Sequence, residues 1–139
     1  MKKARYLVSA CLAGCNCRFD GRNKNNADIK QLVDSGEAIA VCPEELGELS
    51  TPRPPAEIKN NRVFTSLGKD ITLHYSLGAL RALQIAQDHN IEEAFLKSKS
   101  PMCGSNKIYD GSFSKKIITG DGFLAKMLKE RNIKVTEVE

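Results

Sequence analysis

Short apolar runs alternate along the chain with longer segments in which apolar positions recur at helical spacing. The apolar runs predict four buried β-strands, at Tyr6–Ser9, Ala38–Cys42, Glu93–Lys97 and Ile133–Val138. The longer segments predict three helices, from a cap at Asn26 to Gly36, over Thr72–His89 and over Gly122–Arg131. Buried strands joined by helices are typical of a parallel sheet covered on both faces. We therefore expect an α/β fold, Rossmann-like, with a mostly parallel sheet and flanking helices in one domain over residues 1–139.

Three connecting segments are rich in turn-forming residues and are expected to be loops, at residues 10–25, 43–61 and 98–114. The second of them holds four of the five prolines, which excludes a regular element where they are closely spaced. Val63–Thr65 is expected to form one arm of a short hairpin that turns at residues 67–70.

The predicted strands place three cysteines at one edge of the sheet. Cys11 follows the first strand, Cys42 ends the second, and Cys103 lies in the loop after the third. The carboxyl ends of parallel strands meet at the edge where open α/β folds bind their ligands. We therefore expect the cysteine-bearing loops to share one cleft, although the cysteines are far apart in the sequence.

Composition favours metal or thiol chemistry over disulfides. The chain has 139 residues, enough for one domain, and its five cysteines are an odd number with no secretory signal before them. No apolar stretch is long enough to cross a membrane, and we expect a cytoplasmic protein. The net charge of +4 allows a small anionic substrate, and no stable nucleic acid partner is expected.

Thiolates bind zinc, copper(I) and iron–sulfur clusters. Cys15 and Cys17 are too close in sequence for the usual zinc-binding pair, and either is as well explained as a small buried residue. A cluster held by three cysteines leaves one iron without a protein ligand, and that iron can act as a Lewis acid on a substrate.

Polar residues accompany each of the three cysteines. Ser9 precedes Cys11, Glu44 and Glu45 follow Cys42, and Ser100 precedes Cys103. A carboxylate at such a place can move protons, and a serine can orient a substrate or relay a proton. Alternatively, either glutamate pairs with Arg53, and Asp20 forms a turn with Gly21. His74 and His89 are interpreted as surface or packing residues.

Three long motifs, in order along the chain, resemble those of the TudS-type thiouracil and thiouridine desulfidase family, formerly a domain of unknown function. They comprise residues 8–14 with 17–21, residues 42–47 with 51–58, and residues 96–104 with 108–111. The resemblance extends from Tyr6 to about Val138, and the short length is similar to that of the stand-alone members.

The resemblance implies a [4Fe–4S] cluster held by Cys11, Cys42 and Cys103, with the fourth iron binding the substrate's sulfur. It implies that oxygen from water replaces the sulfur of a small thiolated base or nucleotide, such as 2-thiouracil or 4-thiouridine monophosphate, with release of sulfide. The motifs match Glu44 and Ser100 to proton-handling positions, with Ser9 as a further candidate. Candidates for substrate binding are Arg18, Asp20 and Arg53; Arg22, like the two other arginines, is a candidate for holding a nucleotide phosphate.

The sequence departs from the family pattern at Met102, where a second serine is common, and in smaller ways at Glu45 and Glu48. The loss of that hydroxyl favours Ser100 as the functional serine. Two alternatives from other classes remain at this point. One is a non-catalytic metal- or cluster-binding module, and the other is a thiol-redox protein that uses Cys15 or Cys17 with Cys11.

Overall fold

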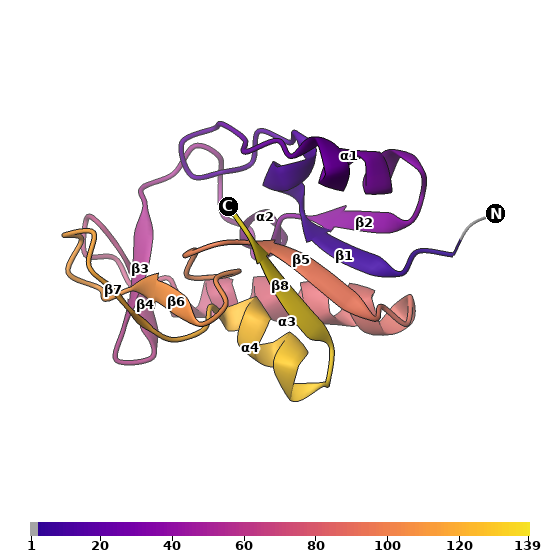
Figure 1. The fold of residues 1–139 in the computed structure, drawn as a ribbon. Helices are drawn as coiled ribbons and strands as arrows, with labels where there is room; N and C mark the ends of the chain where they lie inside the picture. The colour runs from indigo at the N-terminus through magenta and orange to yellow at the C-terminus, as the bar shows by residue number, and fades with distance from the viewer. Residues whose placement is uncertain (1–2) are drawn as a thin grey trace.

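A four-stranded parallel sheet forms the centre of the computed structural model, which describes residues 3–139 (Figure 1). Its strands follow the order β2 (Ala38–Val41), β1 (Tyr6–Ser9), β5 (Glu93–Lys97) and β8 (Lys134–Val138). Each of these strands runs parallel to its neighbours, and Val8 of β1 lies between Ala40 and Phe95. The fold class and the four central strands predicted from the sequence are confirmed.

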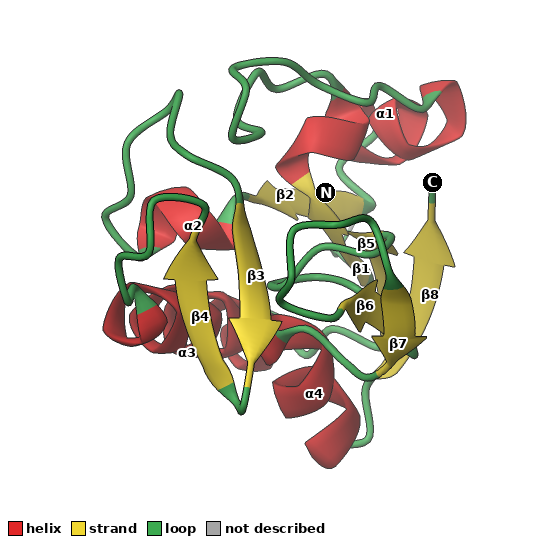
Figure 2. Ribbon diagram, turned by 90° about the vertical axis from the view of Figure 1, so that its left-hand side faces the viewer, coloured by secondary structure: helices red, strands yellow, loops and turns green. Residues whose placement is uncertain are grey.

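Helices cover both faces of the sheet. Helix α1 (Ala27–Asp34) lies on one face, and α3 (Thr72–Asp88) and α4 (Phe123–Glu130) lie on the other, as Figures 1 and 2 show from two directions. Helix α1 begins where the sequence predicts because the Asn26 side chain accepts hydrogen bonds from the N–H groups of Asp28 and Ile29. The described helices lack the combination of length and apolar composition that crossing a membrane requires.

The chain adds strands on the two sides of β1 in turn. Helix α1 leads from β1 to β2 on one side, whereas α3 later brings the chain to β5 on the other side. The carboxyl ends of β1 and β5 therefore flank a topological switch point, which is the usual ligand site of an open α/β sheet. A short 3-10 helix, η1 (Ala10–Ala13), carries Cys11 directly after β1.

The loop predicted over residues 43–61 is shorter in the structure, because both ends of this segment form regular secondary structure. It begins with helix α2 (Pro43–Leu46) and ends with strand β3 (Ala56–Lys59), which starts only after the last proline. Strand β4 (Arg62–Thr65) contains the predicted hairpin arm, but it pairs with β3 through a turn at Asn60 and Asn61. Both asparagines have the positive φ that tight hairpin turns require. The chain also turns where the sequence predicts: the N–H of Gly68 donates to the Thr65 carbonyl at 2.9 Å, and an isolated bridge joins Phe64 to Asp70.

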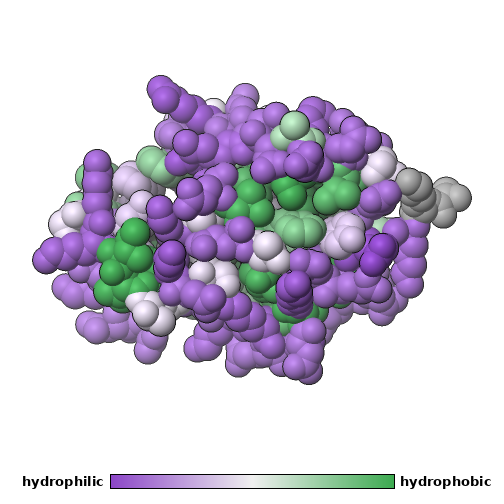
Figure 3. Space-filling model, in the orientation of Figure 1, coloured by the Kyte–Doolittle hydropathy of each residue, from purple (hydrophilic) through white to green (hydrophobic). Residues whose placement is uncertain are grey.

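A second hairpin lies where the sequence predicts a loop. Strands β6 (Lys107–Tyr109) and β7 (Ile117–Thr119) pair in antiparallel fashion across residues 110–116. All three residues of β7 are exposed, so no alternation of apolar and polar positions marks it. Ile117 and Ile118 form part of the apolar patch at the left of Figure 3, over β7.

Helix α3 packs closely because its buried face consists largely of small residues, including Gly78, Ala79 and Ala82. Gly78 meets Gly47, which follows α2: a Cβ on Gly78 would lie 3.0 Å from the Gly47 nitrogen and would overlap the carbonyl oxygen of Pro43. The same helix exposes Leu73 to solvent. The position of α2, and with it that of the residues after Cys42, therefore depends on this glycine contact.

We expect Gly78→Ala to lower the free energy of unfolding by about 1–3 kcal/mol, because the added methyl group forces α2 away from α3. Leu73→Ala on the same helix is the matched control and is expected to change it by less than about 0.5 kcal/mol. Urea unfolding followed by circular dichroism measures both. Equal stability of the Gly78→Ala variant and the parent chain would show that the contact is not tight.

Candidate functional site

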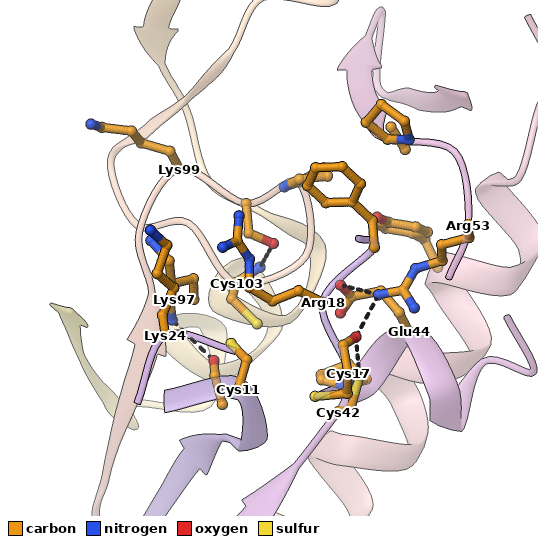
Figure 4. Close-up of a pocket in the computed structure, with 18 of the residues that line it drawn as sticks. Cys11, Cys17, Arg18, Lys24, Cys42, Glu44, Arg53, Lys97, Lys99 and Cys103 are labelled. Atoms are coloured by element: carbon orange, nitrogen blue, oxygen red, sulfur yellow. Dashed lines mark hydrogen bonds and ion pairs between the residues drawn. The ribbon is translucent and has the colours of Figure 1, made fainter. Parts of the chain in front are cut away.

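A cavity of about 510 Å³ opens at the carboxyl edge of the sheet, and the three cysteines predicted to converge there line it (Figure 4). Cys11 comes from η1 after β1, Cys42 from the junction of β2 and α2, and Cys103 from the loop after β5. The parallel topology thus brings together three residues that are far apart in sequence.

The three thiols are arranged for a group larger than one ion. Within residues 3–139, no three His, Cys, Asp or Glu side chains are grouped as ligands of a single metal ion. Cysteines that bind different irons of a cluster are spaced more widely, and three sulfurs around one cavity fit such a group. Burial raises the pKa of Cys11 to about 11 and also raises the pKa of Cys103, and the Glu44 carboxylate acts in the same direction on both. Ligation therefore requires the loss of thiol protons.

The loop that carries Cys103 is shaped by Ser100 and anchored to α4. The Ser100 Oγ accepts hydrogen bonds from the N–H groups of Met102, at 3.0 Å, and Cys103, at 3.1 Å. The N–H of Leu124, in the first turn of α4, donates to the Met102 carbonyl at 2.8 Å. The Met102 side chain is fully buried in the core and is not among the cavity-lining residues, so its departure from the family pattern does not alter the cavity wall.

Ser9 connects the ends of β1 and β5 beneath the cavity. Its Oγ accepts a hydrogen bond of 3.0 Å from the N–H of Lys97, and the side chain is buried. Ser9 also hydrogen-bonds the Cys103 side chain, which lowers the pKa of that thiol against the larger effect of burial. Ser9 and Cys103 both line the cavity.

Glu44 is the carboxyl group buried beside the cysteines, and it pairs with Arg53. The distance between Glu44 Oε2 and Arg53 Nη2 is 3.2 Å, and the side chains are only 17% and 7% exposed. Arg53 also donates to the carbonyl oxygen of Cys17 at 3.0 Å and to Thr51 Oγ1 at 2.8 Å. Burial raises the pKa of Glu44, and the guanidinium of Arg53 opposes that rise. Glu45 instead accepts a hydrogen bond from Thr51.

Positive charge gathers on the opposite side of the cavity, where Arg18, Lys24 and Lys97 line it (Figure 4). Burial lowers the pKa of Lys97, and the nearby charges of Arg18 and Lys24 lower it further. Asp20, predicted from the sequence as a substrate-binding residue, is exposed and accepts a hydrogen bond from the backbone of Arg22. Neither Asp20 nor Arg22 is among the residues that line the cavity.

Cys17 is the residue of this site that sequence reasoning set aside. Its side chain is only 3% exposed, it lines the cavity, and its thiol hydrogen-bonds that of Cys42. This hydrogen bond raises the pKa of Cys17 and lowers the pKa of Cys42. Cys15, two residues earlier, is exposed. The sole indication in the sequence is that Cys17 begins the motif over residues 17–21.

Three comparisons relate this chain to known proteins. The model of the 2-thiouracil desulfurase family matches residues 6–139. The uncharacterised protein YbbK of Bacillus subtilis (strain 168) is 42% identical over 139 aligned residues, which cover 93% of this chain and 92% of that protein. The solved structure of the [4Fe–4S]-dependent thiouracil desulfidase TudS is 39% identical, with a TM-score of 0.91 over 97% of this chain and 91% of that one.

We expect Arg53→Met to lower the free energy of unfolding at neutral pH by about 3 kcal/mol, because it leaves the Glu44 carboxylate buried without its cation. The loss is expected to shrink as the pH falls through the raised pKa of Glu44, since protonation then removes the unpaired charge. Urea unfolding at neutral and mildly acidic pH measures the difference. Adding Glu44→Gln to Arg53→Met is expected to restore part of the stability, and no restoration would show that the pair is not the cause.

Proposed function

The chain belongs to the 2-thiouracil desulfurase family, and on this premise we propose that it removes the sulfur of a thiolated pyrimidine base or nucleotide. In the proposed reaction, oxygen from water replaces the sulfur of the thiocarbonyl group, and the sulfur leaves as sulfide. The related TudS is [4Fe–4S]-dependent, and we propose that this chain uses the same type of cluster.

The observation that carries the proposal is the meeting of Cys11, Cys42 and Cys103 around one cavity at the topological switch point. We assign these three residues as the cluster ligands. When bound, a cluster with three protein ligands supplies one iron that is open to the substrate and acts as a Lewis acid toward its sulfur. The overall change is a hydrolysis and needs no external electron donor or acceptor.

We assign proton transfer to Glu44. Its carboxylate is buried beside the cysteines, where it can accept a proton from the attacking water and later return one to the departing sulfur. Arg53 keeps this carboxyl group in place and is occupied by that contact, so we assign it to positioning Glu44 rather than to binding substrate. Ser100 shapes the loop of Cys103 and orients the substrate or relays a proton, and Ser9 orients the Cys103 thiol.

We propose that the cationic side of the cavity binds the phosphate of a nucleotide substrate. Arg18, Lys24 and Lys97 line this side together, and the charges of Arg18 and Lys24 are close enough to lower the pKa of Lys97. Arg18 presents a planar guanidinium, the group best suited to a phosphate. A free base lacks this contact, which makes a thiolated nucleoside monophosphate the better substrate.

The function is tested by reconstituting the purified chain anaerobically with iron and sulfide. We expect about four irons per chain and release of sulfide from 2-thiouracil or 4-thiouridine monophosphate. Glu44→Gln is expected to keep the iron but to lower kcat by about 10²–10⁴-fold, since it removes the proton acceptor. Iron, acid-labile sulfide and released sulfide are measured by colorimetric assay. A folded chain that takes up zinc alone, or a loaded chain inactive on every thiolated pyrimidine, would contradict the proposal.

The same experiment contains a matched pair of cysteine variants. Cys42→Ala is expected to abolish cluster uptake, because it removes one of three ligands, whereas Cys15→Ala, at an exposed position outside the cavity lining, is expected to retain it. Equal loss of iron in both variants would refute the ligand assignment.

We expect Arg18→Ala to lower kcat/KM for 4-thiouridine monophosphate by about tenfold, through the loss of a charged contact with the phosphate. The value for 2-thiouracil is expected to stay unchanged, because the free base carries no phosphate. Arg22→Ala, on the same loop but outside the cavity lining, is the control. Equal effects of Arg18→Ala on both substrates would remove the phosphate contact from the proposal.

A further inference from the structure

The thiols of Cys17 and Cys42 form a contact that the proposed reaction does not use. Both residues line the cavity, and their thiols are close enough for each to shift the pKa of the other. The Cys42 Sγ also lies 3.7 Å from the carbonyl oxygen of Cys17, so it packs against the backbone of that residue. Cys17 is almost completely buried, which makes this contact a part of the folded structure.

The fold holds the two cysteines together from two sides. Arg53 Nη2 binds the Cys17 carbonyl at 3.0 Å, and the N–H of Arg53 donates to the carbonyl of Phe19 at 2.8 Å. These bonds fasten the segment around Cys17 to the loop that follows α2. On the other side, Cys42 is fixed at the junction of β2 and α2, which packs on α3.

We propose that Cys17 and Cys42 are the site of a reversible disulfide in the chain that has not received its cluster. The oxidant is a small disulfide such as oxidised glutathione. One cysteine thiolate attacks it, which forms a mixed disulfide and releases one reduced glutathione. The second cysteine then attacks the mixed disulfide, which joins Cys17 to Cys42 and releases another. Two thiols are oxidised and one glutathione disulfide is reduced.

The competing bridge is between Cys17 and Cys15, whose side chains are also hydrogen-bonded. These two cysteines are separated by Asn16 alone, so a bridge between them closes a small ring and strains the preferred disulfide geometry. Cys42 lies far from Cys17 in the sequence, so a disulfide between these two cysteines closes no small ring. Cys42 is only partly buried, so a small oxidant that enters the cavity meets Cys42 first, and the buried Cys17 then completes the bridge.

The consequence of the disulfide rests on the proposed function, in which Cys42 is a cluster ligand. An oxidised chain lacks that ligand, so we expect it to take up no cluster until a thiol reductant opens the bridge. Conversely, a bound cluster occupies Cys42 and prevents the bridge. Cys17 thereby provides a reversible protection of one ligand before cluster assembly.

The test uses the full chain without iron, incubated anaerobically with oxidised glutathione. The intact mass is expected to fall by two hydrogen atoms, and trypsin without reductant is expected to release residues 6–18 joined to residues 31–59. The first of these peptides contains Cys11, Cys15 and Cys17, whereas the second contains Cys42 alone. The variants Cys17→Ser and Cys15→Ser therefore identify which cysteine is joined to Cys42. Cys17→Ser is expected to reduce the crosslinked peptide to background, and Cys15→Ser to leave it unchanged. The crosslink persisting in Cys17→Ser, or only glutathione adducts in the parent chain, would overturn the inference.

Iron uptake separates this inference from the proposed function. The oxidised chain is expected to bind iron only after reduction, and the cluster-loaded chain is expected to give no crosslink. If no crosslink forms while the reduced chain loads its cluster normally, the inference fails and the proposed function stands. If the crosslink maps to Cys17 and Cys42 but the oxidised chain loads as fully as the reduced one, the disulfide stands and the assignment of Cys42 as a ligand fails.

Discussion

Parallel pairing of β1 with β2 and β5 is the constraint on which the candidate site depends. It makes the three strands end at one edge, and the residues that follow them become neighbours although they are far apart in the chain. The register is fixed at that edge by Ser9, whose oxygen accepts the N–H of Lys97 directly below the cavity. A shift of one residue would turn each side chain to the opposite face and would disperse the three thiols.

The cavity is divided by charge, and the proposed function gives different tasks to its two sides. Glu44 and Arg53 form a buried pair beside Cys42, which favours proton transfer next to the cysteines. Arg18, Lys24 and Lys97 form the opposite side, where an anionic group of a substrate is best accommodated. Arg53 contributes to both the charge and the shape of the cavity. Its guanidinium pairs with the Glu44 carboxylate and also binds the backbone carbonyl of Cys17.

Two kinds of feature could be predicted from the sequence. The first are elements with a local residue pattern, and the second are contacts that follow from the parallel arrangement of the strands. The apolar runs identified the central strands, Asn26 marked the start of α1, and parallel pairing then implied the meeting of the three cysteines. The hairpin of β6 and β7 was missed because β7 is exposed and shows no alternating pattern. Of the hairpin of β3 and β4, only the arm at Val63–Thr65 was predicted, and its partner strand was not. The choice of Glu44 over Glu45 by Arg53 depends on the single turn of α2, which directs consecutive side chains apart. Cys17 meets Cys42 because the loop before α1 folds back over the end of β2. Such a contact between a loop and a strand end produces no periodic pattern of residues in the sequence.

The dispersion of the proposed ligands along the chain has a consequence for biosynthesis. Cys103 reaches the edge of the sheet only when β5 pairs with β1, and β5 is itself the strand between β1 and β8. A nascent chain that has emerged from the ribosome through Cys42 carries two of the three proposed ligands but no edge on which to present them with the third. With these proposed ligands, cluster delivery has to wait until β5 and Cys103 have left the ribosome, and a chain that terminates before β5 offers an iron–sulfur carrier an incomplete set of ligands.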